Sequence, residues 1–187
     1  IYTLSLHDAL PIFKSFEEFR VIIVPRHPER ADEISDILKE KNLIPIKKSE
    51  INDNFSFSRN HVIVGDTMGE LAMIYSVASI AVIGGSLIPH GGQNFIEPSA
   101  LGKPVICGPY MENFPDVKLF LEEKAIIQLK QIENLSEYVE DLLKNPEKAH
   151  EIGNKASHIV QRSKGSTIKN IEIFKNFINE SSKEFLL

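Results

Sequence analysis

Residues 79–107 read SIAVIGGSLIPHGGQNFIEPSALGKPVIC, and they give the clearest indication of the fold. It opens with an apolar, β-branched run at 79–83 and closes with a second apolar run at 104–107. Between them, a glycine-rich loop leads into residues 95–101, which are typical of a helix. A strand, a helix and a second strand in this order form a β-α-β unit, in which the two strands are parallel.

The same alternation continues on both sides of this unit. We expect further strands at residues 20–24, 43–47, 61–64 and 125–129, with residues 51–60 as a loop. We expect further helices at residues 28–41, 68–78, 116–124, 135–144, 146–162 and 166–181. The sequence therefore predicts an α/β fold, a Rossmann-like parallel sheet with helices on both faces.

The composition is that of an ordinary globular domain. Of the 187 residues, 42% are hydrophobic and 25% are charged, which argues against a disordered tail. The formal net charge of −5 argues against a dedicated nucleic-acid-binding protein. A single cysteine excludes a disulfide within the chain and indicates a reducing compartment. That residue, Cys107, lies in an apolar run, which predicts a buried strand cysteine rather than a nucleophile.

The first twelve residues stand apart from the rest of the chain. They read IYTLSLHDALPI, which looks like one reading frame of a common sequencing adaptor. The alternative is a natural leucine-rich segment. We expect that residues 1–12 are not part of the fold, that protein sequence begins near Phe13 as part of a longer protein, and that one domain spans residues 13–187.

Polar residues follow the predicted strands at the edge where parallel sheets bind ligands. Arg26 and His27 come after the first strand, and both side chains can donate to phosphate or carboxylate oxygens. The alternative is a solvated loop. After the third strand, Asp66 or Thr67 either caps the following helix or lies where the neighbouring backbone reads a base edge.

The glycine-rich loop at residues 84–94 is the second candidate region. Four glycines in this loop are costly in conformational entropy, and close approach of the backbone to a ligand would explain them. Gly91 and Gly92 precede a predicted helix, whose N-terminus favours an anion. Asn94 is a candidate helix cap or ligand contact, and Glu97 is a candidate acceptor for ribose hydroxyls. The alternative is an unliganded turn with an acid that the helix dipole favours.

The sequence predicts no metal site. Asp66 and Glu70 have no further acidic cluster beside them, and the histidines lack zinc spacing. The glycine-rich loop is neither the Gly-x-Gly-x-x-Gly fingerprint nor a Walker loop.

Several segments together resemble the C-terminal domain of the 3-deoxy-D-manno-octulosonic acid (Kdo) transferases, in order and in spacing. These segments are residues 25–30, 65–71, 84–87, 91–94, 97–98 and 108–109. The resemblance implies the C-terminal half of a GT-B glycosyltransferase fold, in which this half binds most of the donor. The implied donor is CMP-Kdo and the implied acceptor is a lipid A precursor of lipopolysaccharide assembly. These enzymes are similar to other GT-B transferases in needing no bound metal, and we expect no other cofactor.

The resemblance also implies three groups of donor-binding residues. Arg26 and His27 would contact the donor phosphate or the sugar acid. The cytidine side would be lined by Thr67, Met68 and Gly69. The phosphate would be bound by Ser86, Gly91, Gly92 and Asn94, and the ribose by Glu97.

The catalytic group is expected elsewhere. In the family the general base is a glutamate of the N-terminal domain, so no catalytic residue is expected in this chain. The acceptor would bind through that domain, at the cytoplasmic face of the bacterial inner membrane. Two alternatives remain open: a non-catalytic nucleotide-sugar-binding module, and a related enzyme, such as a GT-B transferase that uses a UDP-sugar or an epimerase.

Overall fold

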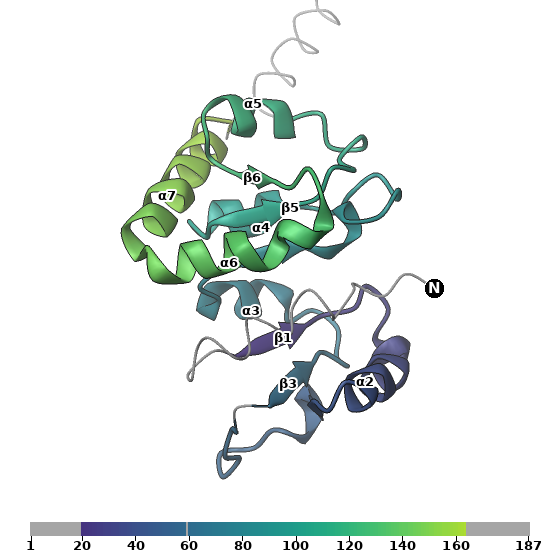
Figure 1. Ribbon diagram of the computed structural model, residues 1–187. Coiled ribbons are helices and arrows are strands. Elements are labelled where there is room, and N and C mark those ends of the chain that lie inside the picture. The colour runs from purple at the N-terminus through teal and green to yellow at the C-terminus, as the bar shows by residue number, and fades with distance from the viewer. Residues whose placement is uncertain (1–19, 59, 164–187) are drawn as a thin grey trace, which may run out of the picture.

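The computed structural model describes residues 20–58 and 60–163 (Figure 1). The helix predicted at residues 166–181 and the segment 1–12 lie outside the described residues.

Among the described residues, six short strands form the framework, and every pairing among them is parallel. The strands are β1 (Val21–Ile23), β2 (Ile44–Lys47), β3 (His61–Val64), β4 (Ala81–Ile83), β5 (Val105–Cys107) and β6 (Ile127–Gln128). They make two three-stranded sheets, with strand orders β1-β3-β2 and β4-β5-β6. The predicted parallel strands and Rossmann-like α/β architecture are confirmed, but the single predicted sheet is divided into two among the described residues.

Helices alternate with these strands. They are α2 (Ala31–Glu40), α3 (Leu71–Val77), α4 (Ile96–Ala100), α5 (Val117–Glu122), α6 (Leu135–Lys144) and α7 (Pro146–Ser163). The 3-10 turns are η1 (Pro28–Arg30), η2 (Lys48–Glu50), η3 (Gly84–Ser86) and η4 (Ile132–Asn134). Helix α3 begins at Leu71 rather than at the predicted residue 68, because Gly69 has a φ of +82° and cannot continue a right-handed helix.

Helices cover both faces of the second sheet. In the central strand β5, Val105 and Cys107 join one apolar cluster with residues of α5 and α7. Ile106 points to the opposite face and joins a second cluster with residues of α6. Successive strand residues point to opposite faces, so a strand buried on both sides must be apolar throughout, as the sequence 104–107 predicts.

The first sheet is covered on one face by α2. Val62 and Val64 of the central strand β3 are fully buried with Leu38 of α2. The alternate residues His61 and Ile63 are only partly buried. Helix α3 lies between the two sheets in Figure 1 and connects the half of the molecule with the first sheet to the half with the second. It contacts α4, and the carbonyl oxygen of its Ser76 accepts a hydrogen bond from the Nζ of Lys103 at 2.8 Å.

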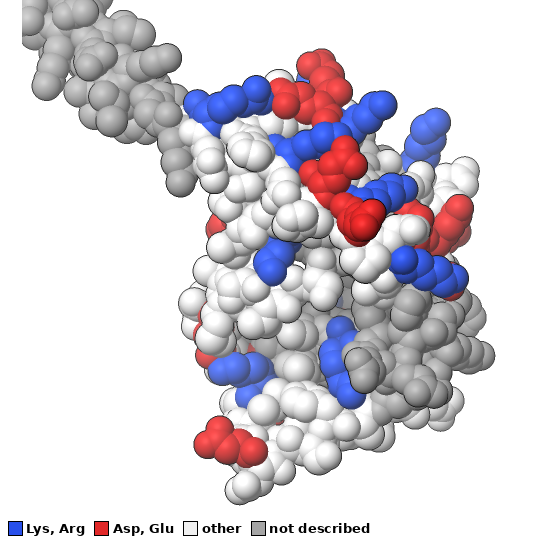
Figure 2. All heavy atoms as spheres, turned by 90° about the vertical axis from the view of Figure 1, so that its left-hand side faces the viewer, with Lys and Arg blue, Asp and Glu red and all other residues white. Residues whose placement is uncertain are grey.

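Charges on the outer helices alternate in sign. Lys148 pairs with Asp141, and Lys155 pairs with Glu151, each at 2.6 Å. Figure 2 shows acidic and basic side chains interspersed on the upper part of one side of the molecule. Exposed pairs of this kind contribute about 0–1 kcal/mol each. Because opposite charges alternate there, this surface lacks the single-sign field that attracts nucleic acid.

Candidate functional site

The candidate residues lie in the loops that follow the strands, as the sequence predicts. Arg26 and His27 follow β1, residues 65–70 follow β3, and residues 84–94 follow β4. Parallel strands within a sheet end at the same edge, which brings the loops of one sheet beside one another. The backbone N–H of Gly65 donates to the carbonyl oxygen of Ile23 at 2.8 Å, which joins the ends of β3 and β1.

Arg26 and His27 are both exposed. The Nδ1 atom of His27 lies 3.5 Å from a carboxylate oxygen of Glu29 at the start of η1. Pro28 occupies the first position of η1, where the lack of a backbone N–H costs nothing. The first sheet therefore presents a guanidinium and an imidazole to solvent directly after its edge strand.

Side chains fix the loop after β3. Asp66 accepts hydrogen bonds from the backbone N–H and the hydroxyl of Ser49. The hydroxyl of Thr67 donates to Glu70, whose carboxylate also accepts from the Nζ of Lys48. Asp66 thus bonds to η2 and does not cap α3. The hydroxyl of Thr67 is engaged inside the loop, so its predicted contact with the cytidine stays a prediction.

The apex of this loop is exposed. The side chain of Met68 is 78% exposed, and a Cβ added to Gly69 would have no atom within 4 Å. Of the three residues predicted to line the cytidine side, these two are therefore in open positions.

The glycines of the second loop have a packing role. Gly91 and Gly92 have φ values of +79° and +91°, which other residues rarely adopt. A Cβ on Gly91 would lie 2.1 Å from Nδ2 of Asn113, and one on Gly92 would lie 2.8 Å from Sδ of Met111. The loop therefore packs tightly on the segment after β5, and this contact explains both glycines without a ligand. Their predicted contact with phosphate stays a prediction.

Ser86 lies beneath the surface of the same loop. Its side chain is fully buried, its hydroxyl donates to the carbonyl oxygen of Ile83, and its oxygen accepts from the N–H of Gly108 at 2.7 Å. A Cβ on Gly108 would lie 2.3 Å from the carbonyl oxygen of Ser86. Ser86 thus connects the ends of β4 and β5. In this conformation its hydroxyl is engaged by protein, so the predicted phosphate contact remains a prediction.

Asn94 and Glu97 form a pair at the surface. The Oδ1 of Asn94 accepts from the N–H of Ile96 at 2.9 Å, and its Nδ2 donates to Oε1 of Glu97 at 2.8 Å. Asn94 therefore satisfies a first-turn N–H of α4 and also orients the carboxylate of Glu97. Helix α4 begins at Ile96, so Gly92 does not directly precede it as predicted.

The structure brings the predicted residues together in two groups. One group lies between β4 and β5 of the second sheet, in the loop that follows β4 and at the start of α4: Ser86, Gly91, Gly92, Asn94 and Glu97. The residues after β1 and β3 belong to the first sheet. Helix α3 connects the groups, because it packs against α4, which carries Glu97. Burial raises the pKa of Tyr75 in α3, and the nearby negative charge of the Glu97 carboxylate raises this pKa further.

Some residues of these loops escaped the sequence prediction. Asn113 contacts the second loop, since its N–H donates to the carbonyl oxygen of Gly91 at 3.1 Å. Gln128, at the end of β6, donates to the carbonyl oxygen of Gly108 at 3.2 Å. Lys48 and Ser49 bond to the first loop. Each follows or ends a parallel strand, so the strand-end rule applied to every strand is the signal that would have found them.

Metal-binding groups and a reactive cysteine are the remaining features to consider among the described residues. They contain no group of three or more histidine, cysteine or acidic residues able to hold a metal ion. Burial raises the pKa of the Cys107 thiol to about 12, so this side chain is a core residue and not a nucleophile, as predicted. Within residues 20–58 and 60–163, no helix has the length and apolar character needed to cross a membrane.

Parallel strands that alternate with helices, with polar loops at the carboxyl ends of the strands, make this a Rossmann-like α/β protein. The family Glycosyl transferases group 1 matches residues 9–158, and the chain belongs to this family. It is 33% identical to the C-terminal CMP-Kdo binding domain of WaaA from Acinetobacter baumannii, whose crystal structure superposes with a TM-score of 0.75 over 83% of this chain and 80% of that one. The resemblance to the C-terminal domain of the Kdo transferases is therefore confirmed.

Relatives of known sequence agree. The chain is 31% identical to the 3-deoxy-D-manno-octulosonic acid transferase of Haemophilus influenzae over 180 residues. This alignment covers 95% of this chain and 41% of that protein. It is 38% identical to a bifunctional glycosyltransferase/methyltransferase of Fusobacterium nucleatum over 133 residues. This alignment covers 70% of this chain and 20% of that protein. The chain thus spans less than half the length of these relatives.

Proposed function

We propose that this chain is the donor-binding part of a Kdo transferase and that it binds CMP-Kdo. The observation that carries the proposal is the similarity to a CMP-Kdo binding domain, at 33% identity and a TM-score of 0.75. The exposed Arg26 supplies positive charge, and Arg26 and His27 both supply hydrogen-bond donors suited to the phosphate and carboxylate of such a donor.

The remaining contacts divide between the two loops. In this proposal the cytidine lies against Met68 and Gly69, whose positions are open to solvent. The ribose hydroxyls donate to Glu97, which Asn94 holds at 2.8 Å. The phosphate lies toward Gly91 and the loop that carries it.

The whole protein would pass Kdo from this donor to a lipid A precursor in lipopolysaccharide assembly, at the cytoplasmic face of the bacterial inner membrane. In this proposal an N-terminal domain binds the acceptor and carries the catalytic glutamate. The chain alone then binds nucleotide weakly and transfers nothing, because half of a cleft supplies only part of the contacts. Transfer of Kdo by this chain alone would contradict that assignment.

Calorimetric titration with CMP, UMP, UDP and AMP tests the proposal. We expect CMP to bind most tightly of the four. Tighter binding of UMP or UDP would instead favour an enzyme that uses a UDP-sugar, and no binding of CMP would refute the proposal.

A single variant tests the assignment of Glu97. Glu97→Asp keeps the charge but withdraws the carboxylate by one methylene, so ribose recognition should weaken while the charge near α4 stays. We expect CMP affinity to fall about tenfold, or ~1.4 kcal/mol. Pyrophosphate, which has no ribose, is the control ligand and should bind both proteins equally. Equal CMP affinity would leave Glu97 with no role in ribose binding.

A further inference from the structure

We propose that Lys48 and Ser49 are positioning residues for the nucleotide, which hold the loop at residues 65–70 in the conformation that presents Met68 and Gly69. Both residues lie in η2, at the end of β2, and outside every segment assigned to the donor above. The inference rests on the proposed function and adds to it a second part of the chain that controls donor affinity.

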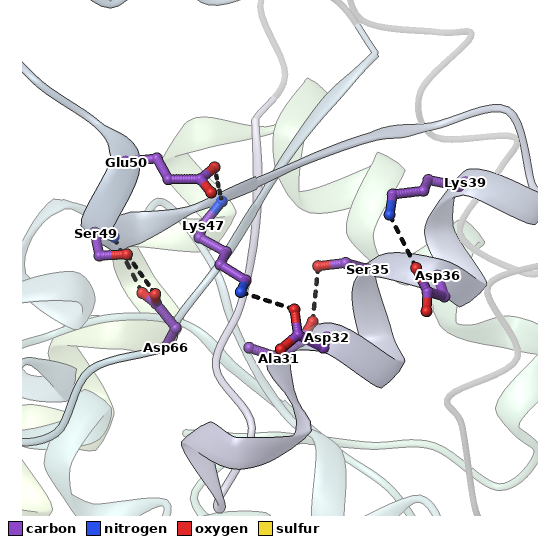
Figure 3. A network of polar contacts seen from close by, with 9 residues as sticks. All are labelled: Ala31, Asp32, Ser35, Asp36, Lys39, Lys47, Ser49, Glu50 and Asp66. Carbon is purple, nitrogen blue, oxygen red and sulfur yellow. Dashed lines mark hydrogen bonds and ion pairs between the residues drawn. The ribbon is translucent and has the colours of Figure 1, made fainter.

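Ser49 holds the beginning of the loop. Its backbone N–H donates to Oδ1 of Asp66 at 3.0 Å, and its hydroxyl donates to Oδ2 of the same carboxylate (Figure 3). These hydrogen bonds keep the pKa of Asp66 below its usual range, so the carboxylate is ionised at neutral pH and accepts both. One residue of η2 therefore occupies both oxygens of Asp66, 17 positions further along the chain.

Lys48 holds the end of the loop. Its Nζ lies 2.5 Å from Oε1 of Glu70, and the two side chains are only 32% and 28% exposed. The other oxygen of Glu70 accepts from the hydroxyl of Thr67. The ammonium group of Lys48 thus fixes Glu70, and Glu70 fixes Thr67 within the loop.

Met68 and Gly69 lie between these two points of attachment. Gly69 takes a φ of +82°, so the chain turns sharply here and exposes the apex. A loop fixed at both ends loses less conformational freedom when a ligand orders it, and it binds more tightly for that reason. Removing either attachment should therefore weaken binding although neither side chain needs to touch the ligand.

Lys47 provides a matched control. It precedes Lys48 directly, and its Nζ forms an ion pair of the same kind, at 2.7 Å from Oδ1 of Asp32 (Figure 3). This pair connects β2 to α2 rather than to the loop. Lys47→Met therefore removes a lysine and an ion pair from the residue before η2, and the hydrogen bonds and the ion pair that attach the loop stay in place. The charge of Lys47 makes only a minor contribution to the lowered pKa of Asp66, after the hydrogen bonds from Ser49.

The experiment is calorimetric titration of the chain with CMP, together with thermal melting of each variant. We expect Ser49→Ala and Lys48→Met each to weaken CMP binding roughly fivefold. Ser49→Thr keeps the hydroxyl and should restore the affinity, and Lys47→Met should bind CMP as the unaltered chain does. Pyrophosphate should bind all of these proteins equally, because its contacts lie outside this loop.

Three results would overturn the inference. Unchanged CMP affinity in both Ser49→Ala and Lys48→Met would show that the attachments do not matter, while CMP binding itself still stands. An equal loss in Lys47→Met would show a general loosening of this half of the molecule. If the unaltered chain does not bind CMP, the proposed function fails, and the inference fails with it. Should one variant not fold, the other tests the same loop from its opposite end.

Discussion

The central strands of the two sheets, β3 and β5, differ in how completely helices cover them. All three residues of β5 are fully buried, between α5 and α7 on one side and α6 on the other. In β3 only alternate residues are buried, beneath α2. Two sheets with three parallel strands each therefore have different surroundings, and we expect the second to contribute more of the stability.

The loops beside these sheets differ in the same way. The loop after β4 is fixed by the close contact of Gly91 with the side chain of Asn113, by the close contact of Gly108 with the backbone of Ser86, and by the buried hydroxyl of Ser86. The loop after β3 is fixed by ionised side chains near the surface, at Asp66 and Glu70. One half of the candidate site depends on shape, and the other half depends on charge.

Replacing one isoleucine in each central strand tests the difference in burial between β5 and β3, and it has the largest expected effect of these predictions. Ile106→Ala, in β5, removes a fully buried side chain and should lower the free energy of unfolding by about 2–5 kcal/mol. Ile63→Ala, in β3, removes a partly exposed one and should have at most about half that effect. Urea unfolding measures both. Equal losses would show that the two sheets are buried alike.

Two glycines test how closely each half is packed. Glycine to alanine usually stabilises a helix interior, but Gly153→Ala in α7 would place a Cβ 2.0 Å from the carbonyl oxygen of Gly102. We expect Gly153→Ala to lower the free energy of unfolding by about 1–3 kcal/mol instead of raising it. Gly69→Ala meets no neighbouring atom, so its cost of about 1 kcal/mol comes from the left-handed backbone alone. Thermal melting distinguishes the two, and a higher melting temperature for Gly153→Ala would refute the close contact.

Lowering the pH tests the charged side chains that attach the loop after β3, and it has the smallest expected effect of these predictions. The hydrogen bonds from Ser49 lower the pKa of Asp66 in the folded protein. The resulting stability is present above the unfolded carboxyl pKa of about 3.9 and is lost as the pH falls through the lower folded value. Because Asp66 is partly exposed, the effect should stay below about 1 kcal/mol.

The measurement is the free energy of unfolding at about pH 6 and about pH 3, for the unaltered chain and for Asp66→Asn. Asp66→Asn should lose less stability between the two conditions, because it lacks the titrating carboxylate. An identical loss in both proteins would show that the Asp66 carboxylate does not contribute to the acid dependence.

The alternation of strands and helices could be read from the sequence. Helix α6 spans the predicted residues 135–144, and Cys107 is buried in a strand as predicted. Such elements follow from the spacing of apolar residues over one or two turns, which is a local property. The position of the candidate residues after the strands followed as well, because the carboxyl ends of parallel strands share one edge.

The contacts of those residues, by contrast, depend on how the chain packs in three dimensions. The phosphate contact of Gly91 stays a prediction, and the structure adds that Gly91 packs against the side chain of Asn113, 22 residues further along the chain. The phosphate contact of Ser86 likewise stays a prediction, and the structure adds that its hydroxyl joins the ends of two strands. The sequence by itself determined the class of fold, the order of its elements and the family of the chain. The packing of loops and the division of the strands into two sheets depend on contacts between distant segments, which no local pattern encodes.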